Sequence, residues 1–214
     1  MLTVHGRATS SNVQAVMWAI GELGLNHQRL DVGGSFRGNR TPEFLKKNPM
    51  GRVPVIEDGE VTLFESQAIL RYLGARHGSE TLWPSDPARR AVVDQWMEWT
   101  KVNVAPVVIY KVFWQLIRTR AADRDLARVA EGIADLKTLM PMAEAQIAHY
   151  GWLAGPDMTL ADISFGTLLF RYFTVPFERA DLPALAEYYQ RLCARPVYAE
   201  NVMVSFESLR VDGA

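Results

Sequence analysis

Residues 48–69 read NPMGRVPVIEDGEVTLFESQAI, and this stretch predicts two antiparallel strands followed by a helix. Residues 52–57 read as the first strand, and Asp58-Gly59 is the strongest two-residue hairpin signal in the chain. Residues 61–64 return as the second strand, and Glu65-Ser66 opens a helix with apolar residues at helical spacing. The stretch therefore predicts a ββα unit that closes a small α/β domain.

The residues before this unit alternate between strand-like and helical patterns. Residues 2–4 form a short apolar run, and from Asn12 the apolar residues recur at helical spacing until Gly24 ends the helix. Residues 28–32 predict a second strand that faces the core through Leu30 and Val32, and a short helix follows. The predicted order, β-α-β-(α)-β-β-α, is the topology of a thioredoxin-like domain, which we place at residues 1–78.

The rest of the chain follows an all-helical pattern. Residues 79–87 contain two prolines and no periodic pattern, which predicts a linker, and residues 88–214 predict an all-α domain. Its first helix is long and is expected to bend at Pro106, where a backbone donor is missing. Further on, Thr159 and Asp162 have the spacing of an N-terminal capping box ahead of another apolar helix.

Composition excludes several classes of function. Of the 214 residues, 49% are hydrophobic and 22% are charged, as in ordinary globular proteins, and the formal net charge is −1. Without a strong positive field, nucleic acid is not expected as a partner. No apolar run reaches membrane-spanning length, so no membrane segment is expected. Cys193 is the only cysteine, and the four histidines lack ligand spacing. These counts predict that the chain forms no disulfide and holds no metal ion. They also predict a cytoplasmic location.

Three segments together resemble the cytosolic glutathione transferases. Residues 48–55 look like the family's loop into a cis-proline strand, residues 63–69 like its strand-to-helix glutamate-serine motif, and residues 151–162 like its helix-capping segment. The resemblance runs from Leu2 to about residue 200. It implies a thioredoxin-like domain followed by a helical domain that lines a hydrophobic acceptor site. It also implies glutathione as co-substrate, no metal, a small electrophile as second substrate, and a homodimer.

The charged ends of glutathione have candidate partners in this sequence. Ser66 begins a helix, so its hydroxyl and the free N–H groups could receive the γ-glutamyl carboxylate, and Glu65 could accept from the ammonium. The alternative is that Ser66 is only a helix cap. The resemblance implies that Val53 pairs with the cysteinyl backbone because a cis Pro54 exposes its N–H and C=O. Arg52 is the favoured partner of the glycyl carboxylate, with Asn39 and Arg40 as alternatives.

The thiol of glutathione must ionise before it can attack an electrophile. Lowering a pKa of ~8.5 by two units requires about 2.7 kcal/mol, which hydrogen-bond donors near a helix N-terminus could supply. Thr9, Ser10, Ser11 and Asn12 stand in such a turn. The resemblance places Ser10 at the catalytic serine of bacterial, serine-type enzymes with a theta- or delta-like turn. Asn12 is the alternative donor, Ser11 is a candidate glutathione contact, and all of these residues could instead cap the helix.

Aromatic residues on the helical domain are candidates for the acceptor site. Tyr110, Phe113 and Trp114 lie on the predicted long helix, and later aromatics extend the set of candidates to Tyr172, Phe173 and Phe206. Aromatics at helical spacing can equally belong to the core. The sequence thus predicts a glutathione transferase that attacks a hydrophobic electrophile. Alternatives are a glutathione-dependent peroxidase or disulfide reductase, and a noncatalytic module that binds hydrophobic ligands or a protein partner.

Overall fold

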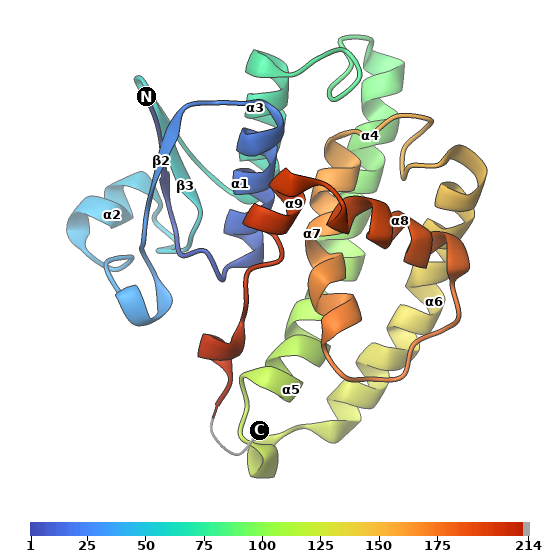
Figure 1. Ribbon diagram of the computed structural model, residues 1–214. Coiled ribbons are helices and arrows are strands. Elements are labelled where there is room, and N and C mark those ends of the chain that lie inside the picture. The colour runs from blue at the N-terminus through green and yellow to red at the C-terminus, as the bar shows by residue number, and fades with distance from the viewer. Residues whose placement is uncertain (212–214) are drawn as a thin grey trace.

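A four-stranded mixed sheet forms the first part of the computed structural model, which describes residues 1–211 (Figure 1). Its strands lie in the order β2-β1-β3-β4, with bounds Leu2–His5 (β1), His27–Leu30 (β2), Val55–Asp58 (β3) and Val61–Phe64 (β4). β1 pairs with β2 in parallel, and the other two pairings are antiparallel. This arrangement confirms the predicted thioredoxin-like topology.

Helices cover both faces of the sheet. α1 (Ser11–Glu22) and α3 (Ser66–His77) contact each other on the face toward the rest of the chain, and α2 (Pro42–Lys47) lies on the other side (Figure 1). The predicted apolar stripes face inward, since Val13, Val16 and Ile69 are fully buried. The N-termini of α1 and α3 lie at the same end of this layer, where Ser66 donates a hydrogen bond to Asn12.

Two local predictions in the sheet were wrong. Leu30 is 43% exposed rather than directed into the core. β2 is an edge strand paired only with β1, so part of its surface is left uncovered. The hairpin turn lies at Gly59-Glu60, one residue later than predicted, because Asp58 still pairs with Val61. Gly59 adopts the positive φ of 62° that the first turn position requires.

A helical bundle makes up the second part of the molecule (Figure 1). Its helices are α4 (Pro87–Trp99), α5 (Trp114–Ile117), α6 (Leu126–Tyr150), α7 (Leu160–Thr174), α8 (Pro183–Cys193) and α9 (Pro196–Asn201). α7 is buried along most of its length and contacts α1, α3, α4 and α8. Residues 212–214 of the predicted helical domain lie outside the described residues. Within residues 1–211, no helix is both long and apolar enough to cross a membrane.

The backbone remains helical from α4 to α5 and becomes π-helical on both sides of Pro106. The π-helical segments are Thr100–Val104 and Val107–Phe113. Ala105 N–H donates to the Thr100 carbonyl and Trp114 N–H to the Ile109 carbonyl, so both hydrogen bonds span five residues. The proline predicted to disturb this helix thus lies between two widened turns. α6, by contrast, continues as an α-helix through Pro141.

The predicted capping box is present at the start of α7. Thr159 accepts a hydrogen bond through its side chain, and Asp162 accepts one from Thr159 N–H at 2.8 Å. Asp162 is fully buried and also accepts from Leu153 N–H and the Tyr188 hydroxyl, each at 2.9 Å. The box therefore fixes both the start of α7 and its contacts with the preceding loop and with α8.

Candidate active site

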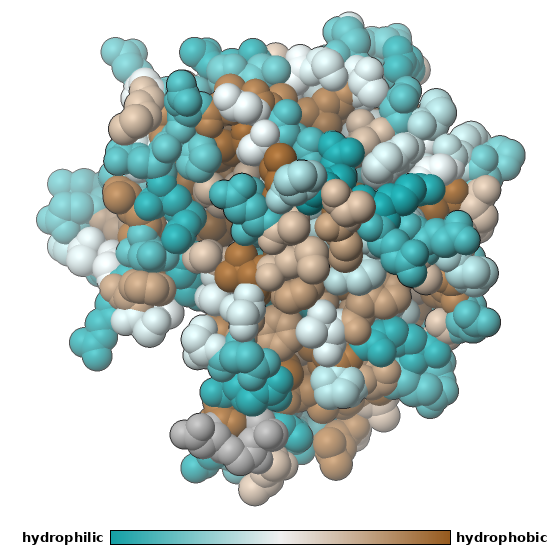
Figure 2. Space-filling model, in the orientation of Figure 1, coloured by the Kyte–Doolittle hydropathy of each residue, from teal (hydrophilic) through white to brown (hydrophobic). Residues whose placement is uncertain are grey.

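A cavity of about 620 Å³ lies between the sheet layer and the helical bundle, and Figure 2 shows a hollow between the two parts. It combines the loop after β1, the loop before β3, the N-terminus of α3 and the helical segment around Pro106. Eleven of the predicted site residues line this cavity: Ser10, Ser11, Asn12, Arg52, Val53, Pro54, Glu65, Ser66, Tyr110, Phe113 and Trp114. Residues distant in sequence therefore meet in one space.

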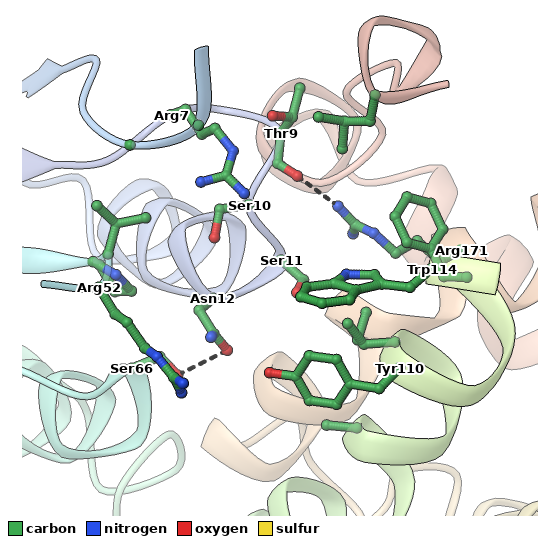
Figure 3. A pocket seen from close by; sticks show the side chains of 18 of the residues that line it. Arg7, Thr9, Ser10, Ser11, Asn12, Arg52, Ser66, Tyr110, Trp114 and Arg171 are labelled. Carbon is green, nitrogen blue, oxygen red and sulfur yellow. Dashed lines mark hydrogen bonds between the residues drawn. The ribbon is translucent and has the colours of Figure 1, made fainter. Parts of the chain in front are cut away.

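Ser10 is the N-cap residue of α1, but its side chain makes no capping hydrogen bond. Its backbone holds the turn, since Ser10 N–H donates to the Arg7 carbonyl and the Ser10 carbonyl accepts from Gln14 N–H. The hydroxyl is thus left free, among the described residues, to donate to a ligand. Figure 3 shows Ser10 between Arg7 and Asn12, in the centre of the view. Capping alone does not account for this serine.

Asn12 is held by two donors from different parts of the molecule. Its Oδ1 accepts from Ser66 Oγ at 3.3 Å and from Lys101 Nζ at 3.4 Å. Within residues 1–211, its amide nitrogen makes no hydrogen bond and can donate to a ligand. Burial lowers the pKa of Lys101, and Arg52 acts in the same direction, whereas Glu65 and Glu98 oppose the change. Asn12 is therefore a second donor in the same turn as Ser10.

The N-terminus of α3 presents Glu65 and Ser66 to the cavity. Ser66 is only 2% exposed, and Glu65 is a non-glycine residue with a φ of 67°. That left-handed conformation is costly for a residue with a side chain, and such residues concentrate at binding sites. It turns the chain from β4 into α3, so that the free N–H groups of the helix face the cavity. This end can receive a carboxylate through N–H groups and a cation through Glu65.

The loop before β3 contains the cis peptide bond between Val53 and Pro54 that the resemblance implied. Two asparagine side chains hold the shape of this loop. Asn48 Nδ2, within the loop, donates to the Arg52 carbonyl at 2.8 Å, and Asn39 Nδ2, from the segment before α2, donates to the Gly51 carbonyl at 2.7 Å. The Asn39 amide, which was an alternative partner for the glycyl carboxylate, is therefore used to support this loop. Arg40 does not line the cavity, whereas Arg52 does.

The helical side of the cavity carries an exposed aromatic pair. Tyr110 and Trp114 are each 42% exposed and pack edge to face, with centroids 4.8 Å apart (Figure 3). Phe113 is 2% exposed and packs against Phe206, so only a small part of it reaches the cavity. None of the later aromatic candidates lines the cavity: Tyr172, Phe173 and Phe206.

Sequence reasoning missed four basic residues that line the cavity: Arg7, Lys101, Arg118 and Arg171. Arg171 is 2% exposed and lies on α7, where it donates to the Thr9 carbonyl at 2.8 Å and to Gln14 Oε1 at 2.7 Å. Burial and the neighbouring Arg7 lower the pKa of Arg171 to about 10. An arginine inside the apolar run of α7 was a signal in the sequence that something polar faced this helix.

Comparison with known proteins identifies the family. A family model described as the N-terminal domain of glutathione S-transferase matches residues 1–75, and one described as its C-terminal domain matches residues 120–191. Glutathione S-transferase GstB from Escherichia coli K12 is 32% identical over 206 residues, which cover 95% of this chain and 99% of that protein. The chain belongs to the glutathione S-transferase family.

Solved structures of glutathione S-transferases agree with this assignment. The theta-class glutathione S-transferase of Xanthomonas axonopodis pv. citri, determined with glutathione bound, has a TM-score of 0.91 and 40% identity. The alignment covers 95% of this chain and 98% of that one. Glutathione S-transferase 4 of Zea mays is 32% identical over 95% of this chain and 92% of its own length. Both alignments therefore cover more than nine-tenths of each chain. Among residues 1–211, no group of His, Cys, Asp and Glu side chains could hold a metal ion.

Proposed function

We propose that this transferase binds glutathione across the cavity and directs its thiolate at an electrophile. The observation that carries the proposal is that three segments resembling the family's glutathione-binding motifs line the same cavity: the Ser10 turn, the Val53-Pro54 loop and the N-terminus of α3. The γ-glutamyl end lies at Glu65 and Ser66, the cysteinyl backbone pairs with Val53, and Arg52 binds the glycyl carboxylate. This orientation brings the sulfur to the turn that contains Ser10 and Asn12.

Ser10 is the proposed donor that stabilises the thiolate. Its hydroxyl is not used for capping, and the N-terminus of α1 favours negative charge close to it. Asn12 contributes a second donor, and Ser11 lines the same end of the cavity. The thiolate then attacks the electrophilic carbon: a C–S bond forms, and the leaving group departs with its electron pair. Holding both reactants in one cavity supplies much of the acceleration.

The proposal is tested by calorimetry with glutathione and by conjugation kinetics with 1-chloro-2,4-dinitrobenzene. We expect saturable binding of glutathione and turnover that depends on it. Parallel assays with a hydroperoxide and with hydroxyethyl disulfide measure the peroxidase and reductase alternatives. Absence of heat and of saturation with millimolar glutathione would contradict the proposal. Conjugation that is slower than both alternative reactions would reassign the enzyme to one of them.

We also propose the arrangement of the working protein. Residues 1–78 bind glutathione, residues 79–87 connect the domains, and the helical domain from residue 88 supplies the acceptor wall. The resemblance to the family favours a homodimer, for which light scattering should give twice the chain mass of 24.1 kDa. The single cysteine favours the reducing cytoplasm, which cell fractionation tests.

A further inference from the structure

Three arginines line the cavity in addition to the aromatic pair. Arg7 follows β1, Arg118 follows α5, and Arg171 lies on α7, and all three line the cavity. In Figure 3, Arg7 lies above Ser10 and Arg171 lies to its right, whereas Ser66 and Arg52 lie below it. Arg118 lies beside the Trp114 ring. The three arginines are therefore separate from Ser66 and Arg52, to which the charged ends of glutathione are assigned.

These three positive charges have no acidic partner in the described part of the chain. No carboxylate of residues 1–211 forms an ion pair with Arg7, Arg118 or Arg171, and Arg171 donates only to neutral oxygens. Arg118 lies 4.8 Å from the centroid of the Trp114 ring. Among residues 1–211, one carboxylate lines the cavity, that of Glu65 on the α3 side. The positive charge of the three arginines is therefore not balanced locally.

Arg7 also has an unused hydrogen-bond donor. Its Nε is buried and has no partner among the described residues. The backbone of Gly34 packs closely against this side chain, since a Cβ on Gly34 would lie 3.1 Å from both Arg7 Cδ and Nε. Burial and the repulsion from Arg118 both lower the pKa of Arg7. Like charges that are kept close together and partly dehydrated are stabilised when an anion binds between them.

We propose that Arg7, Arg118 and Arg171 form an anion subsite and that the preferred electrophiles carry a carboxylate. This inference rests on the proposed transferase function and narrows its substrate class. A planar guanidinium pairs well with a carboxylate through two parallel hydrogen bonds. Tyr110 and Trp114 contact the apolar part of the same molecule. The carboxylate orients the electrophile and is chemically unchanged when the C–S bond forms at its reactive carbon.

Product analogues test the subsite without any difference in chemical reactivity. S-(4-carboxybenzyl)glutathione and S-(4-carbamoylbenzyl)glutathione share the tripeptide and the ring, and they differ in the charge of one group. The corresponding pair with the substituent at ring position 3 places the carboxylate or amide in a second direction from the ring. For the wild-type protein, calorimetry should give a Kd at least tenfold lower for the carboxylate of one pair, which corresponds to about 1.4 kcal/mol. Raising the ionic strength should reduce this preference.

Variants test whether the arginines cause the preference for the carboxylate ligand. Arg118→Gln should reduce the preference to within about threefold because the charge is lost, whereas Arg118→Lys should retain part of it. Arg7→Gln should act in the same direction as Arg118→Gln. The matched control is Arg120→Gln, since Arg120 is an exposed residue that pairs with Asp123 and lies outside the cavity. This control should keep the full preference.

Each other outcome overturns a defined part of the argument. Equal affinity of the wild-type protein for acid and amide in both pairs would overturn the subsite and leave the proposed function standing. An equal loss of affinity for acid and amide in Arg118→Gln would mean that the arginines bind the tripeptide itself, which also overturns the subsite. Failure of the wild-type protein to bind any of the four ligands would overturn both the proposed function and the subsite.

Discussion

Ser10 and Asn12 lie in the same turn, but their neighbours give them different roles. The Ser10 hydroxyl has no partner among the described residues, whereas Asn12 Oδ1 is fixed by Ser66 and Lys101. We expect Ser10→Ala to raise the pKa of bound glutathione by about one unit and to lower kcat/KM at least ~tenfold, because a donor to the thiolate is lost. The thiolate absorbance of the complex, measured against pH, gives the pKa directly. An unchanged titration curve would assign the role to Asn12.

Ser66 should show the opposite kinetic pattern. In the proposed orientation its hydroxyl donates to the γ-glutamyl carboxylate instead of Asn12 Oδ1, and Lys101 still holds Asn12. Ser66→Ala therefore removes a contact made equally in the ground state and the transition state. We expect KM for glutathione to rise roughly fivefold to twentyfold, as for the loss of a charge-assisted hydrogen bond, with kcat nearly constant. Steady-state kinetics at saturating electrophile measures both constants. A fall in kcat with unchanged KM would contradict the proposed placement of the γ-glutamyl end.

Many residues of the candidate site could be predicted from the sequence, because each motif depends only on its own short stretch of chain. Ser66 could be named from the start of a helix, and Ser10 and Val53 from the resemblance of their short segments to the family. Arg7 and Arg171 could not be assigned to the site, because they come together only through packing of the first domain against α7. The sequence also could not decide whether Phe113 belongs to the acceptor wall or to the core, and in the structure its side chain is only 2% exposed.

At the scale of elements, the start of α7 depends on Asp162. Its two carboxylate oxygens accept from Leu153 N–H, Thr159 N–H and the hydroxyls of Thr159 and Tyr188. Asp162→Asn places an NH₂ donor against these donors, and we expect a loss of about 2–4 kcal/mol in the free energy of unfolding. Urea denaturation measures the loss. The control is Asp157→Asn in the same loop, where the side chain is exposed, and it should change stability by less than ~0.5 kcal/mol. Equal stability of the two variants would contradict this account of the box.

Element types were predictable where one periodicity dominated a segment. α1, α3 and the capping box follow from apolar spacing and cap chemistry, which are local properties. The exposure of Leu30 depends instead on β2 being the edge of the sheet, and the turn at Gly59-Glu60 depends on the register between β3 and β4. The π-helical turns beside Pro106 have no sequence pattern of their own. Neighbouring elements decide such features.

At the scale of the whole molecule, the cavity depends on contacts between the two domains. Arg171 on α7 holds the turn before α1 through the Thr9 carbonyl, and Gln67 on α3 donates to Ser164 on α7 at 2.8 Å. At the other end of α1, Arg195 donates to both carboxylate oxygens of Glu22, at 2.9 and 2.6 Å. α1 is therefore fixed to the helical domain at both ends, which keeps the Ser10 turn opposite the aromatic pair.

The Glu22–Arg195 pair should make stability depend on pH in a defined direction. Burial alone would raise the pKa of Glu22, but hydrogen bonds from Arg195 and Trp18 outweigh it and keep the pKa below its ordinary value of 4.5. A carboxylate with a lowered pKa in the folded state stabilises the protein above its unfolded pKa, and this contribution disappears as the pH falls through the folded value. Because solvent reaches the pair, Glu22→Gln should cost only about 1 kcal/mol at pH 7.

Urea denaturation of Glu22→Gln and wild-type protein at a series of pH values measures this dependence. The difference in unfolding free energy should be constant from neutral pH down to about pH 5 and should shrink below about pH 4, as Glu22 takes up a proton. Glu200→Gln is the control, since Glu200 is an exposed residue on α9 that forms no ion pair within the described chain. It removes the same charge and should leave the curve unchanged at every pH. A Glu22→Gln difference that grows as the pH falls would mean that the carboxylate destabilises the folded state, and that Arg195 does not join the two domains through it.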